Sequence, residues 1–266
     1  AYLSAFRLVT ERDRYPAFKI PIVCVPASID NNLPGSELSI GADTALNNAV
    51  RALDSIKQSA AASHRCFVAE IMGRRCGYLS LMSGIATGAE RVYLNEDGIT
   101  LAGLARDTAG MVEAFRSGRE LYLIVRNERA SVNYTTDVLA HIFAEEGHGL
   151  YDVRQAIIGH LQQGGDPTPF DRLMATKLVA HALHLLANQL DAGTAHSSYV
   201  GLTGGRITHH RLEHMNEELD RANRRPLNQW WMGLRGAISL VSQNAGILPL
   251  EEVPDFGASV DEAAAS

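Results

Sequence analysis

The sequence predicts an α/β protein built on a mostly parallel, doubly wound sheet, and three observations support this. Short runs rich in β-branched residues alternate with longer segments that repeat apolar residues at helical spacing. The apolar fraction is 46% with only 6% aromatic residues, which fits an α/β protein better than a β-sandwich. The alternation runs through most of the 266 residues, and this favours a parallel sheet with helices on both faces.

Each expected element follows from a local pattern, taken in chain order. Residues 1–18 have a helical pattern, 20–28 are a short apolar run typical of a buried strand, and 41–62 have the spacing of a long helix. Further strands are expected at 66–71, 91–94, 121–125 and 156–161. Further helices are expected at 76–87, 100–117, 133–147, from the Asp-Pro-Thr-Pro at 166–169 to about residue 190, and at 228–242. A glycine-containing segment at 199–206 and a charged stretch precede the last helix.

Composition and charge exclude several classes of protein. The net charge of −6 does not indicate a general nucleic-acid binder, and no apolar stretch approaches the length of a membrane span. No signal peptide opens the chain. Cys24, Cys66 and Cys76 lack metal-ligand spacing and indicate buried free thiols in a reducing compartment. We therefore expect a cytoplasmic protein with no membrane partner, no nucleic-acid partner and no metal ligands.

Both ends of the sequence indicate boundaries. The chain starts without Met and already in a helical pattern, which suggests a piece of a longer protein. The last ten residues, 257–266, are of low complexity and are expected to be disordered.

Polar and charged residues concentrate just beyond the predicted strands, where open α/β sheets bind ligands. Those that follow strands are Asp30, Asn31, Asn32, Met72, Gly73, Arg74, Arg75, Arg126, Asn127, Glu128, Arg129, His160, Gln162, Gln163, Gly164 and Gly165, whereas His64, Arg65 and Arg154 come just before strands. Guanidinium groups hold phosphate through paired hydrogen bonds, carboxylates accept protons from sugar hydroxyls, and glycines permit close backbone approach. The set therefore suits an anionic, hydroxylated ligand.

Taken singly, each of these residues has a simpler explanation. Asp30 lies among turn-forming residues, and Arg65 and Arg74 can be solvated surface charges. His160 can be a satisfied core histidine, and Glu128 can pair with a neighbouring arginine. Their shared location at strand ends is what favours a sugar-phosphate site.

Four segments together resemble the 6-phosphofructokinase family. They are Ser-Ile-Asp-Asn-Asn at 28–32 and the segments 41–46, 72–78 and 159–172. The match runs in order from about residue 21 to 186. Further matches at 57–61, 125–128, 133–137 and 228–231 resemble the C-terminal, regulatory half of the double-length eukaryotic-type enzymes more closely than the short bacterial ones.

The resemblance implies a two-lobed phosphofructokinase-like fold whose N-terminal lobe is incomplete here. It assigns 1–41 and 162–210 to this partial first lobe, 42–161 and 211–250 to a sugar-phosphate lobe, and 251–266 to a disordered tail. The sugar-phosphate site is then expected between the lobes and across a subunit contact.

The resemblance also implies roles for individual residues. Asp30 falls on the catalytic base that deprotonates the 1-hydroxyl of fructose 6-phosphate. Arg65 and Arg154 fall on arginines that reach a neighbouring site, so a homo-oligomer, either a dimer or a tetramer, is expected. The remaining substrate or effector contacts are Ser28, Ile29, Asn31, Asn32, Met72, Gly73, Arg74, Glu128, His160, Gln163 and Arg224.

Two substitutions and one absence depart from the catalytic pattern. Asn32 replaces a carboxylate associated with magnesium, and an amide is a poorer ligand for Mg²⁺ than a carboxylate. The replacement also removes a negative charge. Two unit charges about 4 Å apart repel by roughly 4 kcal/mol at an effective dielectric of about 20, so a second phosphate meets less repulsion here. Gln163 replaces an arginine, while Asp30 and Arg74 keep the catalytic types. Nothing before Pro21 supplies a glycine-rich phosphate loop, so ATP and Mg²⁺ belong to the intact enzyme, and this chain alone is expected to be inactive.

Three functions remain open from the sequence. The first is the regulatory half of a glycolytic 6-phosphofructokinase, binding a phosphorylated fructose such as fructose 2,6-bisphosphate. The second is a catalytic half in which Asp30 is the base. The third is an assembly half with a vestigial pocket.

Overall fold

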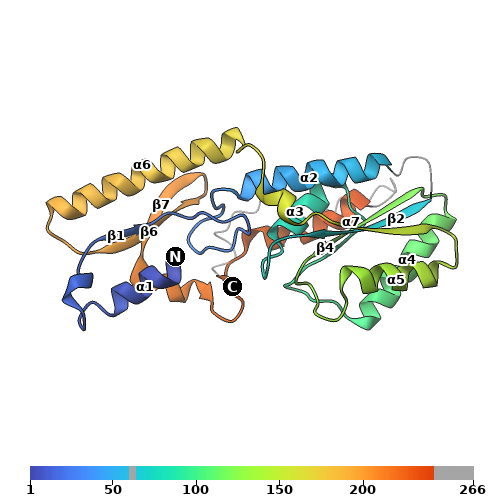
Figure 1. Ribbon diagram of the computed structural model, residues 1–266, viewed down its shortest axis with the longest axis horizontal. Helices are drawn as coiled ribbons and strands as arrows, with labels where there is room; N and C mark the ends of the chain where they lie inside the picture. The colour runs from blue at the N-terminus through green and yellow to red at the C-terminus, as the bar shows by residue number, and fades with distance from the viewer. Residues whose placement is uncertain (60–63, 243–266) are drawn as a thin grey trace, which may run out of the picture.

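The computed structural model describes residues 1–59 and 64–242, which form two lobes side by side (Figure 1). The first lobe holds a three-stranded sheet of order β1-β6-β7, and the second holds a four-stranded sheet of order β3-β4-β2-β5. The α/β fold class expected from the sequence is confirmed. In the described part of the chain, no helix has the length and hydropathy needed to cross a bilayer.

The second lobe is an all-parallel sheet between two helix layers. Its strands are β2 (Arg65–Ile71), β3 (Arg91–Tyr93), β4 (Leu121–Asn127) and β5 (Asp152–Ile157). Side chains that alternate along β2 and β4 bury one face against α2 (Ala42–Ser59) and α3 (Tyr78–Thr87). The other face packs on α4 (Leu101–Arg116) and α5 (Thr136–Gly147).

The first lobe is a smaller, mixed sheet. β1 (Ile22–Cys24) runs parallel to β6 (Ser197–Thr203), which pairs antiparallel with β7 (Arg206–Arg211). One face packs on α6 (Pro169–Asp191), and the other packs on α1 (Tyr2–Thr10) and on η3 (Leu212–Glu217).

The remaining elements are short. They are η1 (Pro16–Phe18), η2 (Gly159–Gln163), β8 (Leu219–Asp220), β9 (Arg225–Pro226), η4 (Trp230–Gly236) and α7 (Ala237–Ser242).

Several expected boundaries are wrong, each for a local reason. The strand expected at 156–161 ends as β5 at Ile157, since Gly159 turns the chain with φ +55° into η2; His160 is therefore exposed rather than inside a strand. The helix expected at 1–18 ends at Thr10, and Pro16 then begins a separate 3₁₀ turn. The last helix divides into η4 and α7.

The glycine-containing segment at 199–206 is a β-hairpin that the sequence analysis missed. Gly204 and Gly205 have φ +57° and +74°, which allows the tight turn between β6 and β7. The η3 segment that follows packs on α1 and β6 in the first lobe, whereas the sequence division assigns 211–250 to the other lobe. The helix end expected at 60–62 and the tail at 251–266 lie outside the described residues.

Candidate functional site

A wide hollow of about 640 Å³ opens where β1 leads into the loop that holds Asp30. Residues of both lobes line it, including seven of the expected contacts: Ser28, Ile29, Asp30, Asn32, Met72, Arg74 and Gln163. The rest of the lining comes mainly from α1 and β1 and includes Ala1, Tyr2, Ala5, Val23, Cys24 and Val25. We call the part around Asp30 the polar end and the part formed by these six residues the apolar end.

Asp30 is a buried carboxylate at the polar end, with 8% of its surface exposed. Burial raises the pKa of this carboxyl above its usual value, the Arg74 guanidinium lowers it, and the Glu128 carboxylate raises it further. Arg74 Nε lies 4.0 Å from Asp30 Oδ2, too far for a close ion pair to offset burial. A raised pKa makes Asp30 a stronger proton acceptor and also eases its protonation beside an anion.

Hydrogen bonds within the loop orient the side chains next to Asp30. The Ser28 hydroxyl donates to Asn32 Oδ1 over 2.8 Å and accepts from the Asp30 N–H over 3.2 Å. Because the Asn32 oxygen is engaged, its Nδ2 is left to donate. Asn31 has φ +52° and turns away, since its Oδ1 accepts from the N–H and hydroxyl of Ser39. Asn31 therefore shapes the loop and does not line the hollow.

The loop after β2 brings Arg74 to the polar end. Gly73 has φ +144°, and a Cβ there would lie 2.4 Å from the Cys76 carbonyl oxygen, so this position requires glycine. Glu128, directly after β4, accepts the N–H of Arg74 over 2.7 Å and of Gly73 over 3.3 Å, both at Oε1. Within the described residues its Oε2 has no hydrogen-bond partner and can accept from a sugar hydroxyl.

Gln162 is a structural anchor, whereas the resemblance assigns a ligand contact only to its neighbour Gln163. Gln162 is 1% exposed, and its Oε1 accepts the Met72 N–H over 2.8 Å. On the other side of the segment, Asn48 of α2 donates to the Gly164 carbonyl over 2.6 Å. These bonds hold η2 against the Arg74 loop and present Gln163 to the hollow; two adjacent glutamines before two glycines were the available signal.

Arg65 and Arg154 lie away from the hollow. Arg65 begins β2, whereas the Arg74 loop follows the far end of that strand. Arg154 lies on β5, in register with Phe67 of β2. Both arginines approach Asp152, with Arg154 Nη2 2.8 Å and Arg65 Nε 4.0 Å from its Oδ2. Their contact with a neighbouring subunit stays a prediction.

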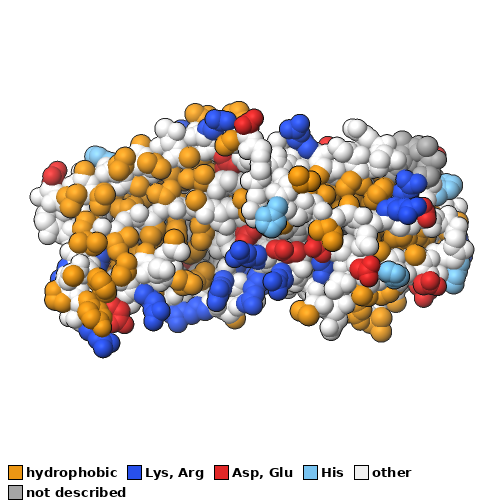
Figure 2. Space-filling view, in the orientation of Figure 1, with side chains coloured by type: hydrophobic (Ala, Val, Ile, Leu, Met, Phe, Trp, Pro, Cys, Tyr) orange, Lys and Arg blue, Asp and Glu red, His pale blue; other side chains and the backbone are white. Residues whose placement is uncertain are grey.

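His160 and Arg224 also fall outside the hollow lining. His160 is exposed on η2. Arg224, in the turn between β8 and β9, lines a separate hollow of about 440 Å³ with Arg7 and Arg221. Figure 2 shows Lys and Arg side chains gathered below the junction of the lobes.

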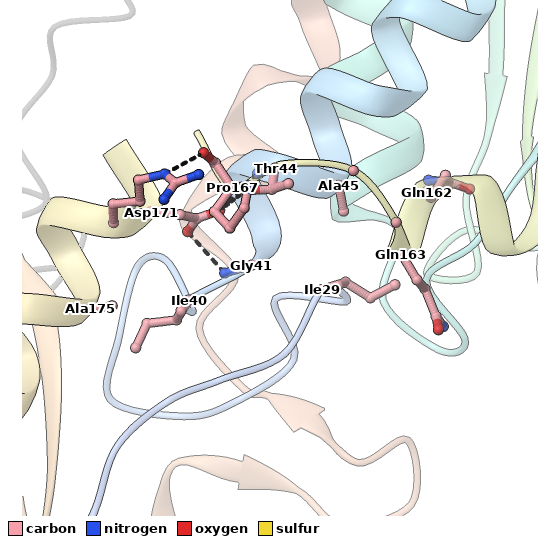
Figure 3. A pocket seen from close by; sticks show the side chains of 13 residues that line it. Ile29, Ile40, Gly41, Thr44, Ala45, Gln162, Gln163, Pro167, Asp171 and Ala175 are labelled. Atoms are coloured by element: carbon pink, nitrogen blue, oxygen red, sulfur yellow. Dashed lines mark hydrogen bonds between the residues drawn. The ribbon is translucent and has the colours of Figure 1, made fainter. Parts of the chain in front are cut away.

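A smaller hollow of about 330 Å³ lies where α2 and α6 begin (Figure 3). It shares Ile29 and Gln163 with the wide hollow. At its rim the buried Asp171 carboxylate of α6 accepts the N–H groups of Gly41 and Thr44, each over 2.8 Å. Asp171 thus caps α2 from the other lobe and fixes how the lobes meet.

The residues beside Asp30 do not fit a magnesium site of their own. No group of three or more His, Cys, Asp or Glu that could hold a metal ion occurs within residues 1–59 and 64–242. The amide of Asn32 stands where a second carboxylate is expected, and hard cations favour carboxylates.

The family model, the related sequences and the related structures all indicate the same family. Residues 2–186 match the family described as Phosphofructokinase. The ATP-dependent 6-phosphofructokinase of Dictyostelium discoideum is 43% identical over 254 residues, which cover 94% of this chain and 30% of that protein. The phosphofructokinase structures from Saccharomyces cerevisiae and from Pichia pastoris in the T-state superpose with TM-scores of 0.86 and 0.83, each at 33% identity over 91% of this chain.

These relatives are much longer than the chain. It covers 33% of the Saccharomyces chain and 29% of the Pichia chain. The chain therefore spans about a third of the length of the proteins that it matches.

Proposed function

The chain belongs to the phosphofructokinase family, and we propose that it is the regulatory half of a glycolytic, ATP-dependent 6-phosphofructokinase. In this role it binds a phosphorylated fructose such as fructose 2,6-bisphosphate, in the cytoplasm, at the polar end of the wide hollow. The observation that carries the proposal is Asn32, whose oxygen accepts from Ser28 and whose Nδ2 is left as a donor for an anion.

The residues of the polar end supply the contacts that such a ligand needs. The Arg74 guanidinium is 80% exposed and free to meet a phosphate at the rim. Glu128 Oε2 accepts a hydrogen bond from a sugar hydroxyl, while Oε1 accepts the N–H groups that hold the loop. Asp30 repels a nearby anion less than an ordinary carboxylate does. Its raised pKa favours the protonated form, which donates a hydrogen bond.

The proposal extends to an oligomer of dimer or tetramer type. Arg154 is mostly exposed on β5, and this exposure supports its contact with the site of a neighbouring copy. Arg65 is expected to join it there. His160 and Arg224 enter the proposal on the family resemblance alone.

A catalytic role is the second candidate, and the buried Asp30 with its raised pKa favours it. In that role Asp30 accepts the proton of the fructose 6-phosphate 1-hydroxyl, and the rest of the intact enzyme supplies ATP and Mg²⁺. Asn32 argues against this candidate because it removes a carboxylate from the loop. An assembly half with a vestigial pocket is the third.

Calorimetric titration of the 266-residue chain with fructose 2,6-bisphosphate and with fructose 6-phosphate tests the proposal. Arg74→Ala should weaken binding of the bisphosphate by tenfold or more, because a charged hydrogen bond to phosphate is lost. Arg116→Ala, at an exposed position of α4, is the matched control and should leave binding unchanged. If Arg74→Ala binds the bisphosphate as tightly as the parent does, Arg74 is not part of the site. If neither ligand gives a heat of binding, only the assembly role is left.

A further inference from the structure

Arg126, at the carboxyl end of β4, is an arginine to which the proposed ligand contacts give no role. Its place at a strand end groups it with the residues suited to hold an anion. It does not line the wide hollow, however, and only 1% of its surface is exposed. A cation that is buried so completely must be paired, so its partners indicate what it does.

The Arg126 guanidinium joins three separate segments. Its Nη1 donates to Glu70 Oε2 over 2.8 Å, on the neighbouring strand β2, where the two residues are paired in register. Its Nη2 donates to the Ser131 carbonyl over 2.7 Å, and its Nε donates to the Tyr134 carbonyl over 3.1 Å. The Thr136 hydroxyl, at the start of α5, also donates to Glu70 Oε2. The ends of two strands are thus connected with the start of α5.

The segment that Arg126 holds is the β4–α5 loop, residues 128–135. Val132 of this loop is 88% exposed, whereas Ala130 is buried. Both carbonyls that accept from Arg126 lie in the second half of the loop. A planar guanidinium that donates to three acceptors fixes their relative positions, which the single ammonium of a lysine cannot reproduce.

Glu128 is the first residue of the β4–α5 loop, and its Oε1 holds the Arg74 loop. The Ala130 N–H donates to the Asn127 carbonyl over 2.9 Å, so the chain turns directly after β4. Arg126 precedes this turn and also binds the carbonyls that follow it. It therefore holds the chain on both sides of the turn in which Glu128 lies.

We propose that Arg126 is a positioning residue for the ligand site: it fixes the β4–α5 loop and, through this loop, the direction of the Glu128 carboxylate. Glu70 and Thr136 support this role by orienting the guanidinium. Arg126 itself touches no ligand. The inference rests on the proposed function for the sugar contact of Glu128, whereas the hold of Glu128 on the Arg74 loop depends on no ligand.

Amide hydrogen exchange of the 266-residue chain tests the positioning without a ligand. Arg126→Lys keeps the charge but loses the planar fork, so the amides of 73 and 74, which donate to Glu128, should exchange about tenfold faster. Phe143→Leu, at a buried position of α5, is the matched control. It disturbs the same lobe but leaves the polar contacts of the loop in place, so both amides should keep the parent rate. Equal acceleration in the two variants, or none in Arg126→Lys, would overturn the proposal.

Thr136→Val provides a milder variant in case Arg126→Lys does not fold. It removes one donor to Glu70 and leaves the ion pair with Arg126 in place. The same amides should exchange about two- to threefold faster, and Thr136→Ser, which keeps the hydroxyl, should restore the parent rate. The parent rate in Thr136→Val would overturn the proposal.

A double-mutant cycle with Glu128→Ala connects Arg126 to the ligand. Calorimetry measures the affinity for fructose 2,6-bisphosphate in the parent, in both single variants and in the double variant. Arg126→Lys should weaken binding about fivefold or more in the parent and have no effect once the Glu128 carboxylate is gone, because it acts through that group. Equal weakening in both backgrounds would overturn the proposal. If the parent binds neither this ligand nor fructose 6-phosphate, the proposed function fails, and the amide exchange alone decides the role of Arg126.

Discussion

Asp30 is buried, and the nearest guanidinium, that of Arg74, lies too far away to offset the effect of burial on its pKa. Arg74 is largely in solvent, and its Nε is 4.0 Å from the carboxylate, so solvent screens much of their attraction. Burial then dominates and raises the pKa of Asp30 in the folded chain. The same property serves a proton acceptor and a residue that tolerates phosphate.

The pH dependence of stability should carry the signature of Asp30. Its pKa in the folded chain is above the unfolded value of about 3.9, so the folded chain binds more protons between the two values. The stability that this proton uptake gives is fully present below the unfolded pKa and is lost as pH rises through the folded pKa. Asp30→Asn should therefore be more stable than the parent at pH 7, with a smaller advantage at acid pH. Urea unfolding at both pH values measures this, and an advantage independent of pH would contradict it.

Some residues of the candidate site can be predicted from sequence, and others cannot. Asp30, Arg74 and Glu128 follow directly after apolar runs, and parallel strands bring such positions together. Asn31 and Gln162 are different, because the orientation of an amide depends on backbone groups from distant segments. The Ser39 N–H donates to Asn31 Oδ1, and the Met72 N–H donates to Gln162 Oε1.

At the scale of elements, the loop between β2 and α3 is the most constrained connection near the site. Gly73→Ala should lower the free energy of unfolding by about 1–3 kcal/mol, because its Cβ would meet the Cys76 carbonyl and its φ of +144° disfavours other residues. Gly110→Ala is the matched control. It lies within α4 with nothing within 4 Å of the added Cβ, and it should gain about 0.5–1 kcal/mol. Urea unfolding measures both; equal effects would contradict the account of this loop.

Helix α6 has one buried face and one uncovered face. Leu178 is fully buried against the first sheet, while Leu183 is 61% exposed. Leu178→Ala should cost about 2–5 kcal/mol of the free energy of unfolding, and Leu183→Ala within about 0.5 kcal/mol. Thermal and urea unfolding of the 266-residue chain compare the two. A large loss from Leu183→Ala would show that this face is already covered.

The elements differ in how far their sequence determines them. α2 repeats apolar residues at helical spacing and β4 begins with a continuous apolar run, and both are found close to the expected ranges. The β6–β7 hairpin was missed, because β7 contains Arg-Ile-Thr-His-His-Arg and lacks a clear apolar alternation. The end of β5 depends on the positive φ of Gly159, which a run of apolar letters does not reveal.

At the scale of the whole molecule, the two lobes meet at a joint next to the wide hollow. Asp171 caps α2 from α6, and Thr168 Oγ1 donates to Asp43 Oδ2 over 2.6 Å at the same place. Residues from the two lobes face each other across the polar end, so ligand affinity depends on this joint. The two-lobed α/β fold was predictable from alternation and resemblance, but the arrangement of the lobes rests on these polar contacts between distant segments.

The proposed regulatory function, and its catalytic alternative with Asp30 as the base, are told apart most directly by turnover. In the full-length enzyme that contains this chain, Asp30→Ala is assayed at saturating ATP and fructose 6-phosphate, with folding checked by thermal unfolding. The regulatory function predicts turnover close to that of the parent, together with a weakened response to fructose 2,6-bisphosphate. A loss of about 10²-fold or more in turnover would contradict it and would make Asp30 the general base.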